Sequence, residues 1–427
     1  MVGDPLRLLA LLLIGLNVLL ALWLLFRRDA RWAVVLWTIA LFFAPVYVNV
    51  SVQGVALTVL DVVTMVAIVG CWPSVRLRWS VVDTLAVAAF GAIVVGLLFG
   101  GVWGHVQYTV FSWLLPYIWG RIAIAAVGSE FVVSCISVIA VVAAALAIIE
   151  FATGVNIFVL IPGVSGAMWT NLQYRGGLLR AEGAFGHSIS LGSSLAISSA
   201  FVLVTTWRWW WKAGALAIVT TAIVMTLSRI GLVGLLLVIA LSVVFLGRYI
   251  RIGQRVAAVG LSLVALVAAV PFISTVFDDA GDEAAGSAEY RADLLPLVGD
   301  MNAIGVSDAR RVDATGVDYF GGFQSIDSAL ILTGLRHGIV PLAILVLMLA
   351  VCVWVVVTGR GSPAAVAIVS QIPALATVAL ITQYAPFLWF VAGIAVSSYS
   401  LAWRRDGAHG EAPVLDDARH TLLKGAT

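Results

Sequence analysis

The sequence predicts an all-α polytopic membrane protein with about 12 or 13 transmembrane helices, and three observations support this fold class. Of the 427 residues, 62% are hydrophobic and 11% are charged, whereas soluble domains have roughly 45–50% apolar and about 25% charged residues. The mean hydropathy is +1.09. Apolar stretches close to the length of about 20 residues that a bilayer requires recur along nearly the whole chain. These observations exclude a soluble globular enzyme, a disordered chain and a collagen-like fibre.

The apolar stretches define the expected spans, and each span should be helical because a single segment in lipid must satisfy its own backbone hydrogen bonds. The spans are expected at 6–26, 32–50, 54–72, 81–100, 107–127, 131–152, 188–206, 213–228, 230–247, 256–276, 329–357, 364–381 and 387–402. One close pair, 213–228 and 230–247, leaves the number at 12 or 13. The first span is too long and apolar for a cleaved signal peptide.

The basic residues predict how the chain is oriented. They concentrate in alternate loops, and by the positive-inside rule those loops are cytoplasmic. The loops contain Arg27, Arg28, Arg31, Arg76, Arg78, Arg208, Lys212, Arg248, Arg251, Arg255, Arg360, Arg404 and Arg405. We therefore expect a multi-pass protein of the cytoplasmic (plasma) membrane. Residues 1–403 would form one membrane domain, and 404–427 a short cytoplasmic tail.

Two long segments are then expected outside, at 153–187 and 277–328. The second holds half of the 22 acidic residues and is expected to contain short helices. Long loops in a compact fold are usually functional. Within the spans, the default interpretation of Asp83 and Asp61 is helix packing or a buried pair with Arg121.

The composition indicates neither a metal site nor a nucleic-acid partner. The formal net charge is only +2, and the three cysteines Cys71, Cys135 and Cys352 lie far apart in or beside apolar runs. The sequence contains no H-E-x-x-H, P-loop or G-x-S-x-G pattern. We therefore expect no metal and no cofactor.

A first polar motif, RAEGAFGH (180–187), precedes the helix expected to begin near Ser188. Its glycines allow close approach of a ligand to the backbone, and a helix start offers free N–H groups to an anion such as phosphate. Arg180 and His187 are therefore candidate ligand-binding residues. The alternative is a loop with a helix N-cap and an arginine that reaches toward the interface.

A second and a third motif also place arginines in outward segments. SRIGLVG (228–234) presents Arg229 in a tight turn, where it either binds a diphosphate or reaches to the outer interface. The pattern of 287–308 predicts a short amphipathic helix followed by a glycine turn, with Arg291 in very acidic surroundings. Arg291 either contacts an anion or forms a surface ion pair with a neighbouring carboxylate.

A fourth motif, QSIDSALILTGLRHG (324–338), opens the helix after the long acidic segment. Asp327 is expected to be the N-cap of that helix, a general base at a membrane-surface pocket, or both. Arg336 and His337 lie two to three turns further along. Ionisable groups inside a span tend to line a cavity, and both are candidate substrate-binding residues, although His337 would also fit as a neutral packed histidine.

In their order and outward placement these motifs resemble the O-antigen ligase/polymerase superfamily of bacterial membrane glycosyltransferases. The resemblance covers roughly residues 150–360. It rests on RAEGAFGH (180–187), SRIGLVG (228–234), EYRADLL (289–295) and SIDSALILTGLRHG (325–338). It implies a GT-C-like fold and transfer of a glycan from a polyprenyl diphosphate carrier to an acceptor hydroxyl on the outer side of the membrane. It also implies that neither a nucleotide sugar nor an essential metal is needed.

The resemblance further implies roles for individual residues. Arg180 and Arg291 would hold the diphosphate, and Arg229 belongs to a further family motif. Ligases of the family usually have histidine where this chain has Asp327, which favours a repeat-unit polymerase over a ligase. The implied partners are the polyprenyl-diphosphate-linked donor, a glycan acceptor and the lipid bilayer. The alternatives left open are an O-antigen-type ligase and a lipid-linked glycan flippase or transporter.

Overall fold

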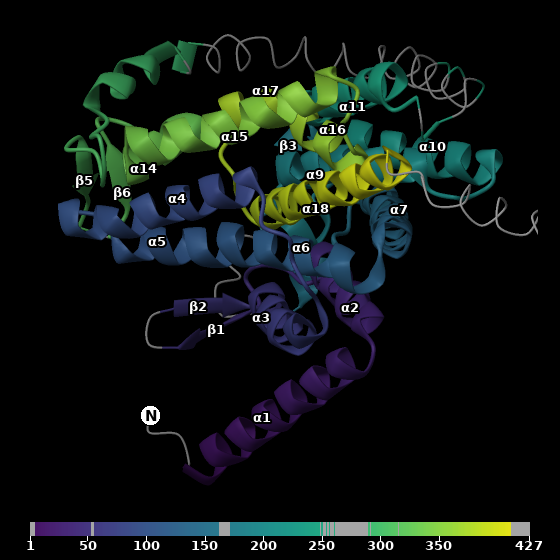
Figure 1. Cartoon of the computed structure of the whole chain (residues 1–427). Helices are drawn as coiled ribbons and strands as arrows, with labels where there is room; N and C mark the ends of the chain where they lie inside the picture. Colours follow the sequence, from purple (N-terminus) through teal and green to yellow (C-terminus); the bar gives the residue numbers. More distant parts are fainter. Residues whose placement is uncertain are drawn as a thin grey trace, which may run out of the picture.

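The described part of the chain folds into a bundle of helices with three small antiparallel hairpins, as a computed structural model shows (Figure 1). Four of the described helical segments are long and apolar enough to cross a membrane: Val81–Phe99, Trp103–Val127, Ser129–Thr153 and Ile339–Val357. Several shorter apolar helices accompany them, as in a helical membrane protein. The structure describes residues 5–52, 55–161, 171–247, 249–250, 253, 256, 260, 289–290, 292–314 and 316–410.

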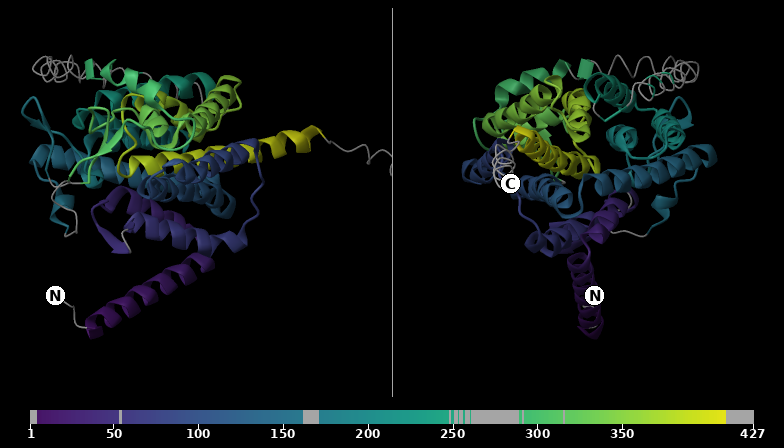
Figure 2. Two further views of the ribbon diagram at one scale, coloured as in Figure 1. Left: turned by 90° about the vertical axis from the view of Figure 1, so that its left-hand side faces the viewer. Right: turned by 45° about the vertical axis from the view of Figure 1, so that its right-hand side comes forward.

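The N-terminal helices α1 (Pro5–Arg28), α2 (Ala30–Phe43) and α3 (Val59–Cys71) form one edge of the bundle. Figure 2 shows α1 reaching away from the other helices, with its last turn close to the end of α3. At that point the Cys71 thiol lies 3.9 Å from the carbonyl oxygen of Phe26.

The expectation of helix throughout 32–50 and 54–72 is wrong, because a β-hairpin joins α2 to α3. Its strands are β1 (Asn49–Val52) and β2 (Val55–Thr58), paired antiparallel. Alternating valines favour a strand over a helix at β1. Thr58 then starts α3 through a capping box with Asp61, so Asp61 serves as a helix cap and not as a partner of Arg121.

The middle of the bundle is built around α9 (Ser188–Val204), which is buried on nearly all its faces. It packs with α7 (Ser129–Thr153), α10 (Trp209–Met225) and α11 (Arg229–Phe245). Gly192 of α9 meets Gly231 of α11, where a Cβ on Gly231 would lie 3.2 Å from the Gly192 backbone. Two glycines therefore let α9 and α11 approach closely, as small residues do between membrane helices.

Both expected spans in the region 329–381 are broken. The stretch 329–357 divides into α14 (Ala329–His337) and α15 (Ile339–Val357) at Gly338, whose φ of +99° favours glycine. The stretch 364–381 divides into α16 (Pro363–Ser370) and α17 (Ile372–Thr377), with Pro373 near the start of α17.

A non-helical segment, 378–383, follows α17 and leads into α18 (Tyr384–Gly410). We call residues Val378 to Gln383 the strap. Because α17 ends at Thr377, the strap exposes backbone carbonyl groups that a continuous helix would have used internally. These carbonyls become binding partners for other parts of the chain.

The acidic segment 277–328 is described only in part. Its described residues contain a short 3₁₀ helix, Leu295–Asp300, and a hairpin of β5 (Arg310–Val312) and β6 (Asp318–Phe320). In the segment 287–308, where a short amphipathic helix is expected, residues 289–290 and 292–293 are helical and the 3₁₀ helix follows from Leu295. The expected span 256–276 and most of the tail 404–427 lie outside the described residues.

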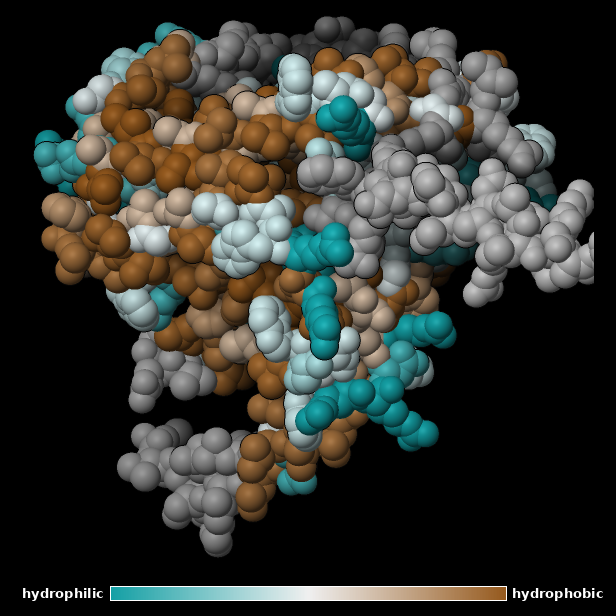
Figure 3. All heavy atoms as spheres, in the orientation of Figure 1, coloured by the Kyte–Doolittle hydropathy of each residue, from teal (hydrophilic) through white to brown (hydrophobic). Residues whose placement is uncertain are grey.

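Much of one face of the bundle is apolar (Figure 3), as expected for helices in contact with lipid. Figure 3 shows a nearly continuous hydrophobic area where α4 (Val81–Val95) and α15 lie in Figure 1. Large exposed hydrophobic side chains on α15 are Ile339, Val340, Val346, Leu347, Trp354 and Val357. An apolar face of this extent indicates a membrane-associated protein.

Candidate functional site

The strap is the point at which sequence motifs far apart in the chain meet. The N–H of Ala329, at the start of α14, donates to the carbonyl oxygen of Val378 at 3.0 Å. The Ser190 hydroxyl, in the first turn of α9, donates to the carbonyl oxygen of Ile381 at 3.4 Å. One six-residue segment therefore lies against both the first turn of α9, which follows the RAEGAFGH motif, and the QSIDSALILTGLRHG motif.

Three further hydrogen bonds fix the strap. The Tyr108 hydroxyl of α5 (Trp103–Thr109) donates to the carbonyl oxygen of Leu380 at 2.5 Å. The Gln383 amide donates to the carbonyl oxygens of Ala184, at 3.0 Å, and Ala44, at 2.9 Å. Thr382 has a positive φ of +47°, which is strained for a β-branched residue, and its buried hydroxyl has no partner in the described part of the chain. Strain of this kind clusters at functional sites.

Arg180 links the motif 180–187 to the turn that precedes the motif 228–234. Its Nε donates to the carbonyl oxygen of Thr226 at 3.1 Å, and its Nη1 donates to Oε1 of Gln173 at 3.4 Å. The next residue continues the link, because the Ala181 N–H donates to the carbonyl oxygen of Met225 at 3.0 Å. Arg180 therefore holds the turn that precedes Arg229.

The turn itself is held from a second side. Arg175, in the hairpin of β3 (Tyr174–Arg175) and β4 (Leu178–Leu179), donates from Nη1 to the carbonyl oxygen of Leu227 at 3.0 Å. Leu227 has a φ of +50°. Ser228 then caps α11 through the N–H of Gly231, which leaves the exposed Arg229 as the first residue of that helix.

His187 is the N-cap of α9, so the expected helix N-cap in this loop is present. Its Nδ1 accepts a hydrogen bond from the N–H of Ile189 at 3.3 Å. Burial, with a further contribution from the Arg180 charge, lowers the pKa of His187 to about 4. The imidazole is therefore neutral at pH 7, and because Nδ1 accepts, its proton lies on Nε2, which is a hydrogen-bond donor.

Two buried glutamates, Glu150 and Glu182, support the loop 180–187. The sequence motifs did not predict that these two residues lie together. The Glu150 carboxylate accepts from the N–H groups of Glu182 at 3.0 Å and Gly183 at 2.9 Å, and from the Asn156 amide at 3.0 Å. Glu182 accepts from the Gln173 N–H through Oε1, while its buried Oε2 has no partner within the described ranges.

The environment of Glu182 favours its neutral form. Burial raises the pKa of Glu182 to about 7, the Gln173 N–H opposes that shift, the nearby Glu150 charge adds to it, and Arg180 opposes it. Local sequence could have signalled this group, since Glu182 stands between Arg180 and Gly183 of the motif. Its partner Glu150 lies 32 residues earlier, in α7, where no local pattern connects the two.

Asp327 lies half-buried just before α14, and the N-cap of that helix is Ser328, which corrects the N-cap assignment of Asp327. The Ser325 hydroxyl donates to Asp327 at 3.1 Å. Tyr290 donates to the carbonyl oxygen of Ser325, and burial followed by the Asp327 charge raises the pKa of Tyr290. Arg291, the next residue, lies outside the described residues.

Arg336 and His337 lie at the end of α14 next to a polar cluster that the sequence did not predict. His337 is buried, its Nε2 is 3.2 Å from the Thr109 hydroxyl, and its ring meets that of His105 edge-on at 6.3 Å. This matches the packed-histidine interpretation of His337. Arg336 has a buried Nε without a partner in the described part of the chain.

His105 connects this cluster to the acidic segment. Its Nε2 lies 2.8 Å from Oδ2 of Asp318, and Arg310 contacts Oδ1 of the same carboxylate at 2.6 and 2.9 Å. Burial alone would raise the pKa of Asp318, but the hydrogen bonds from Arg310 and His105 outweigh it and the pKa lies below its usual value. His105 and Asp318 are 213 residues apart, too far for a sequence pattern to pair them.

An apolar cavity of about 830 Å³ lies between α4 and the helices α14 to α18. Ala329, Thr333, Trp113 and Leu380 line the end of the cavity nearest the strap. Its volume is near the upper end of the range of about 300–1,000 Å³ for small-molecule pockets. The cavity therefore offers an apolar ligand space beside the site formed around the strap.

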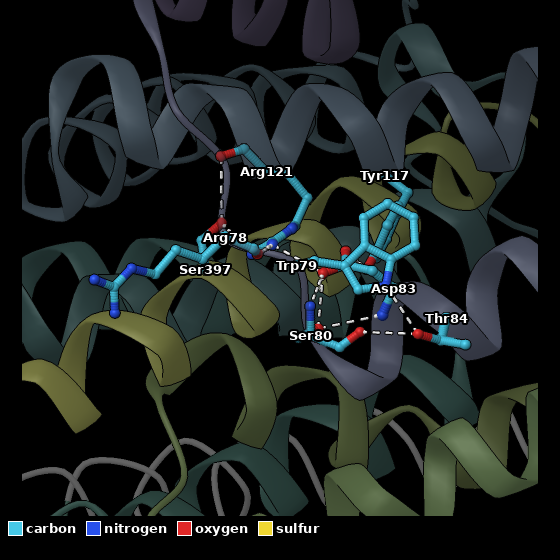
Figure 4. Close-up of polar contacts among 8 residues, drawn as sticks. All are labelled: Arg78, Trp79, Ser80, Asp83, Thr84, Tyr117, Arg121 and Ser397. Carbon is cyan, nitrogen blue, oxygen red and sulfur yellow. Dashed lines mark hydrogen bonds and ion pairs between the residues drawn. The ribbon is translucent and has the colours of Figure 1, made fainter.

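The other end of the cavity is lined by Arg78, Trp79, Ser80 and Tyr399. Here Arg121 and Asp83 form a buried ion pair at 2.9 Å, which confirms the pairing expected for Asp83 (Figure 4). Arg121 also donates to the Ser397 hydroxyl at 3.0 Å and to the carbonyl oxygen of Arg78. The Tyr117 hydroxyl donates to Asp83 at 2.7 Å.

The structure thus joins the Arg180, His187 and Arg229 segments directly and brings the start of α14 to the same strap. Within the described ranges, no group of three or more His, Cys, Asp or Glu residues is placed to hold a metal ion. Comparison with protein-family models gives no match, and comparisons with curated proteins and with solved structures give no significant match.

Proposed function

We propose that this chain is a multi-pass protein of the cytoplasmic membrane that transfers a polyprenyl-diphosphate-linked glycan to an acceptor hydroxyl on the extracytoplasmic face. The favoured form of the reaction is polymerisation of polysaccharide repeat units. The observation that carries the proposal is the strap, which meets α9 at Ser190 and α14 at Ala329. The apolar cavity beside it would accommodate the part of the lipid carrier next to the diphosphate.

The proposed orientation rests on where the basic residues lie. Arg27 and Arg28 occupy the last turn of α1, and Arg78 lies at the end of the cavity away from the strap. The positive-inside rule makes that end cytoplasmic. The strap, the Arg229 turn and Asp327 then face outward, where a glycan acceptor has access.

In the proposed reaction, the bond between the anomeric carbon and the phosphate oxygen breaks, and the diphosphate leaves with the electron pair. The acceptor oxygen attacks from the opposite face, so the anomeric configuration inverts. A diphosphate is already a good leaving group, so positioning and charge stabilisation are the main requirements. The acceptor proton passes to Asp327, which acts as general base or orients the hydroxyl.

The arginines take different parts in this proposal. Arg229 is exposed at the start of α11 and would contact the diphosphate bidentately. Arg180 acts partly through the turn it holds, because two of its guanidinium nitrogens bond to Thr226 and Gln173. Neutral His187 would donate from Nε2 to the same anion. Arg291 is proposed as a further diphosphate ligand from its place in the sequence motif.

A lipid-linked glycan flippase is the second candidate, and a specific observation favours it. Broken helices are typical of transporters, and this chain has breaks at Gly338 and at Gln371. In transporters, however, such breaks surround polar groups near the middle of the membrane. Here the polar clusters lie at the two ends of the cavity, one at the strap and one around Arg121 and Asp83, and this arrangement supports the transferase.

Deletion of the protein, followed by analysis of accumulated lipid-linked glycan, tests the proposal. Single-repeat intermediates on the outer leaflet support the polymerase. Full-length polymer that stays unattached indicates a ligase, and an intermediate trapped on the cytoplasmic leaflet indicates the flippase. Either of the last two results, or unchanged glycan, rejects the polymerase.

Complementation with Asp327→Asn sharpens the test. Loss of a general base reduces rates by about 10²–10⁴-fold, so chain growth should fall by at least about a hundredfold. Asp300→Asn, at an exposed acidic residue of the same segment, is the matched control and should grow normal chains. Normal polymer from Asp327→Asn would remove this residue from the mechanism.

A further inference from the structure

The cavity end opposite the strap carries a feature that glycan transfer does not require. Arg78, Trp79 and Ser80 enter the bundle at the start of α4 and line this end, together with Tyr399 of α18. The Trp79 side chain is 70% exposed although it borders an apolar cavity. An exposed arginine and an exposed indole beside an empty apolar space need an explanation.

The backbone of this segment is held rigidly. Arg121 donates to the carbonyl oxygen of Arg78, and the N–H and hydroxyl of Ser80 donate to Asp83 at 2.7 and 2.8 Å. The Trp79 indole N–H donates to the Thr84 hydroxyl at 2.8 Å. Figure 4 shows the contacts of Ser80 and of the Arg78 carbonyl meeting at Asp83 and Arg121, with the Trp79–Thr84 contact beside them. A buried ion pair is costly to maintain, and here it fixes the position of an exposed segment.

The Arg78 side chain is not used in this network. Figure 4 shows its guanidinium directed away from Asp83 and Arg121, and it makes no hydrogen bond or ion pair within the described part of the chain. Arg76 lies two residues earlier, and residues 72–80 contain no acidic side chain. The rim of the cavity is therefore cationic, with a guanidinium free to bind.

These features match the chemistry of one ligand class. Guanidinium groups bind phosphate oxygens bidentately, tryptophan favours the level of lipid headgroups, and the apolar cavity below is suited to a hydrocarbon chain. Basic residues attract anionic lipids by about 1 kcal/mol each. A neutral zwitterionic headgroup offers the same phosphate but lacks the net charge that Arg76 and Arg78 complement.

We propose that the Arg78 end of the cavity binds an anionic glycerophospholipid, with its phosphate on Arg78 and one acyl chain between α4, α15 and α18. The lipid would come from the leaflet facing this end, which is the cytoplasmic leaflet if the orientation proposed above holds. The site rests on that membrane placement and not on glycan transfer. It shares the cavity with the donor lipid, which would enter from the strap end.

The test measures binding of phosphatidylglycerol and of phosphatidylcholine to the purified full chain in detergent by native mass spectrometry. Phosphatidylglycerol should bind more tightly than phosphatidylcholine. Arg78→Gln should weaken phosphatidylglycerol binding at least about fivefold, the factor that corresponds to about 1 kcal/mol per basic residue. Arg76→Gln is the matched control and should bind more tightly than Arg78→Gln, because Arg76 does not line the cavity.

A second variant examines the cavity independently of charge. Ala395→Phe, on the cavity wall of α18, should fill the space for the acyl chain and also weaken binding. Folding should survive Arg78→Gln, because the network uses the Arg78 carbonyl and not its side chain. Equal loss in Arg78→Gln and Arg76→Gln overturns the site, as does equal binding of the two lipids.

Competition separates this site from the donor site. Added polyprenyl phosphate should leave phosphatidylglycerol bound to the unmodified protein. Complete displacement would assign the whole cavity to the donor and overturn the proposed lipid site. Polymer length in cells, measured separately, reports on the transferase proposal, so the two proposals can fail independently.

Discussion

Among the residues that the structure describes, buried polar groups are paired with one another at one end of the cavity and are partly unpaired at the other. At the Arg78 end, Arg121 and Asp83 are paired with each other and with neighbouring side chains in one closed network. At the strap end, Glu182, Arg336 and Thr382 each keep a buried polar atom without a partner in the described part of the chain. The Arg78 end is therefore rigid. The strap end has buried donor and acceptor atoms that a ligand could pair with, as expected of a ligand site.

The largest expected effect comes from breaking the closed network. Arg121→Gln leaves the Asp83 carboxylate buried without its counterion, which typically costs about 3–5 kcal/mol. Thermal unfolding in detergent should shift to a clearly lower temperature. The double variant Asp83→Leu with Arg121→Met should recover much of the loss, because it removes both charges. An unchanged unfolding temperature in Arg121→Gln would contradict the importance of the pair.

At the strap end, a pair of matched substitutions compares two glutamates that accept different numbers of hydrogen bonds. Glu150→Gln places an amide group where the carboxylate accepts three N–H donors, so it should cost about 1–3 kcal/mol for a donor left unsatisfied. Glu182→Gln mimics the neutral acid and should cost less. Equal destabilisation of both variants by chemical denaturation would contradict this difference in hydrogen bonding.

The same glutamate predicts a pH dependence with a definite sign. The pKa of Glu182 is raised to about 7 in the folded chain, above the value near 4.3 for an unfolded chain. The favourable contribution of protonated Glu182 to the free energy of unfolding is present below about pH 4 and is lost as the pH rises through about 7. The difference in stability between the unmodified chain and Glu182→Gln should follow that course between pH 4 and 8. A flat difference would contradict it.

A smaller effect is expected where His105 joins the acidic segment. Loss of a charge-assisted hydrogen bond lowers the free energy of unfolding by about 1.5–3 kcal/mol. Asp318→Asn should lower it by less, because the carboxylate is partly exposed. Because the folded pKa of Asp318 is lowered, the unmodified contact should weaken as the pH falls below about 4. Hydrogen exchange of the backbone amides of residues 310–320 measures the weakening of this contact, and Asp308→Asn is the control.

The smallest change tests strain in the strap. Thr382→Gly removes a β-branched side chain from a positive φ and deletes a hydroxyl without a partner. Stability should stay the same or rise by up to about 1 kcal/mol. Lower stability would show that the Thr382 side chain contributes contacts that outweigh the strain, and calorimetry in detergent distinguishes the two.

Periodicity and length predicted most helices because hydrophobicity alone marks them. The expectation for 131–152 matches α7, and that for 188–206 matches α9 within two residues. The hairpin β1–β2 and the breaks at Gly338 and Gln371 were missed, because apolar composition does not distinguish a strand or a broken helix from a continuous span.

The candidate site was predicted in its parts and not in its arrangement. Local patterns identified Arg180, His187 and Arg229, since a polar motif before a helix is visible in sequence. The strap was not predicted, because residues 378–381 are apolar and act through their backbone carbonyl groups. Side-chain chemistry in the sequence carries no signal for such contacts.

The central claim is that the strap gathers the residues that extend a lipid-linked glycan. The most direct measurement is the length distribution of lipid-linked glycan in cells that carry Arg229→Gln in place of the unmodified chain, with Arg76→Gln as the matched control. The account predicts that single repeats accumulate with Arg229→Gln and that full polymer forms with Arg76→Gln. Full polymer from both variants would contradict it.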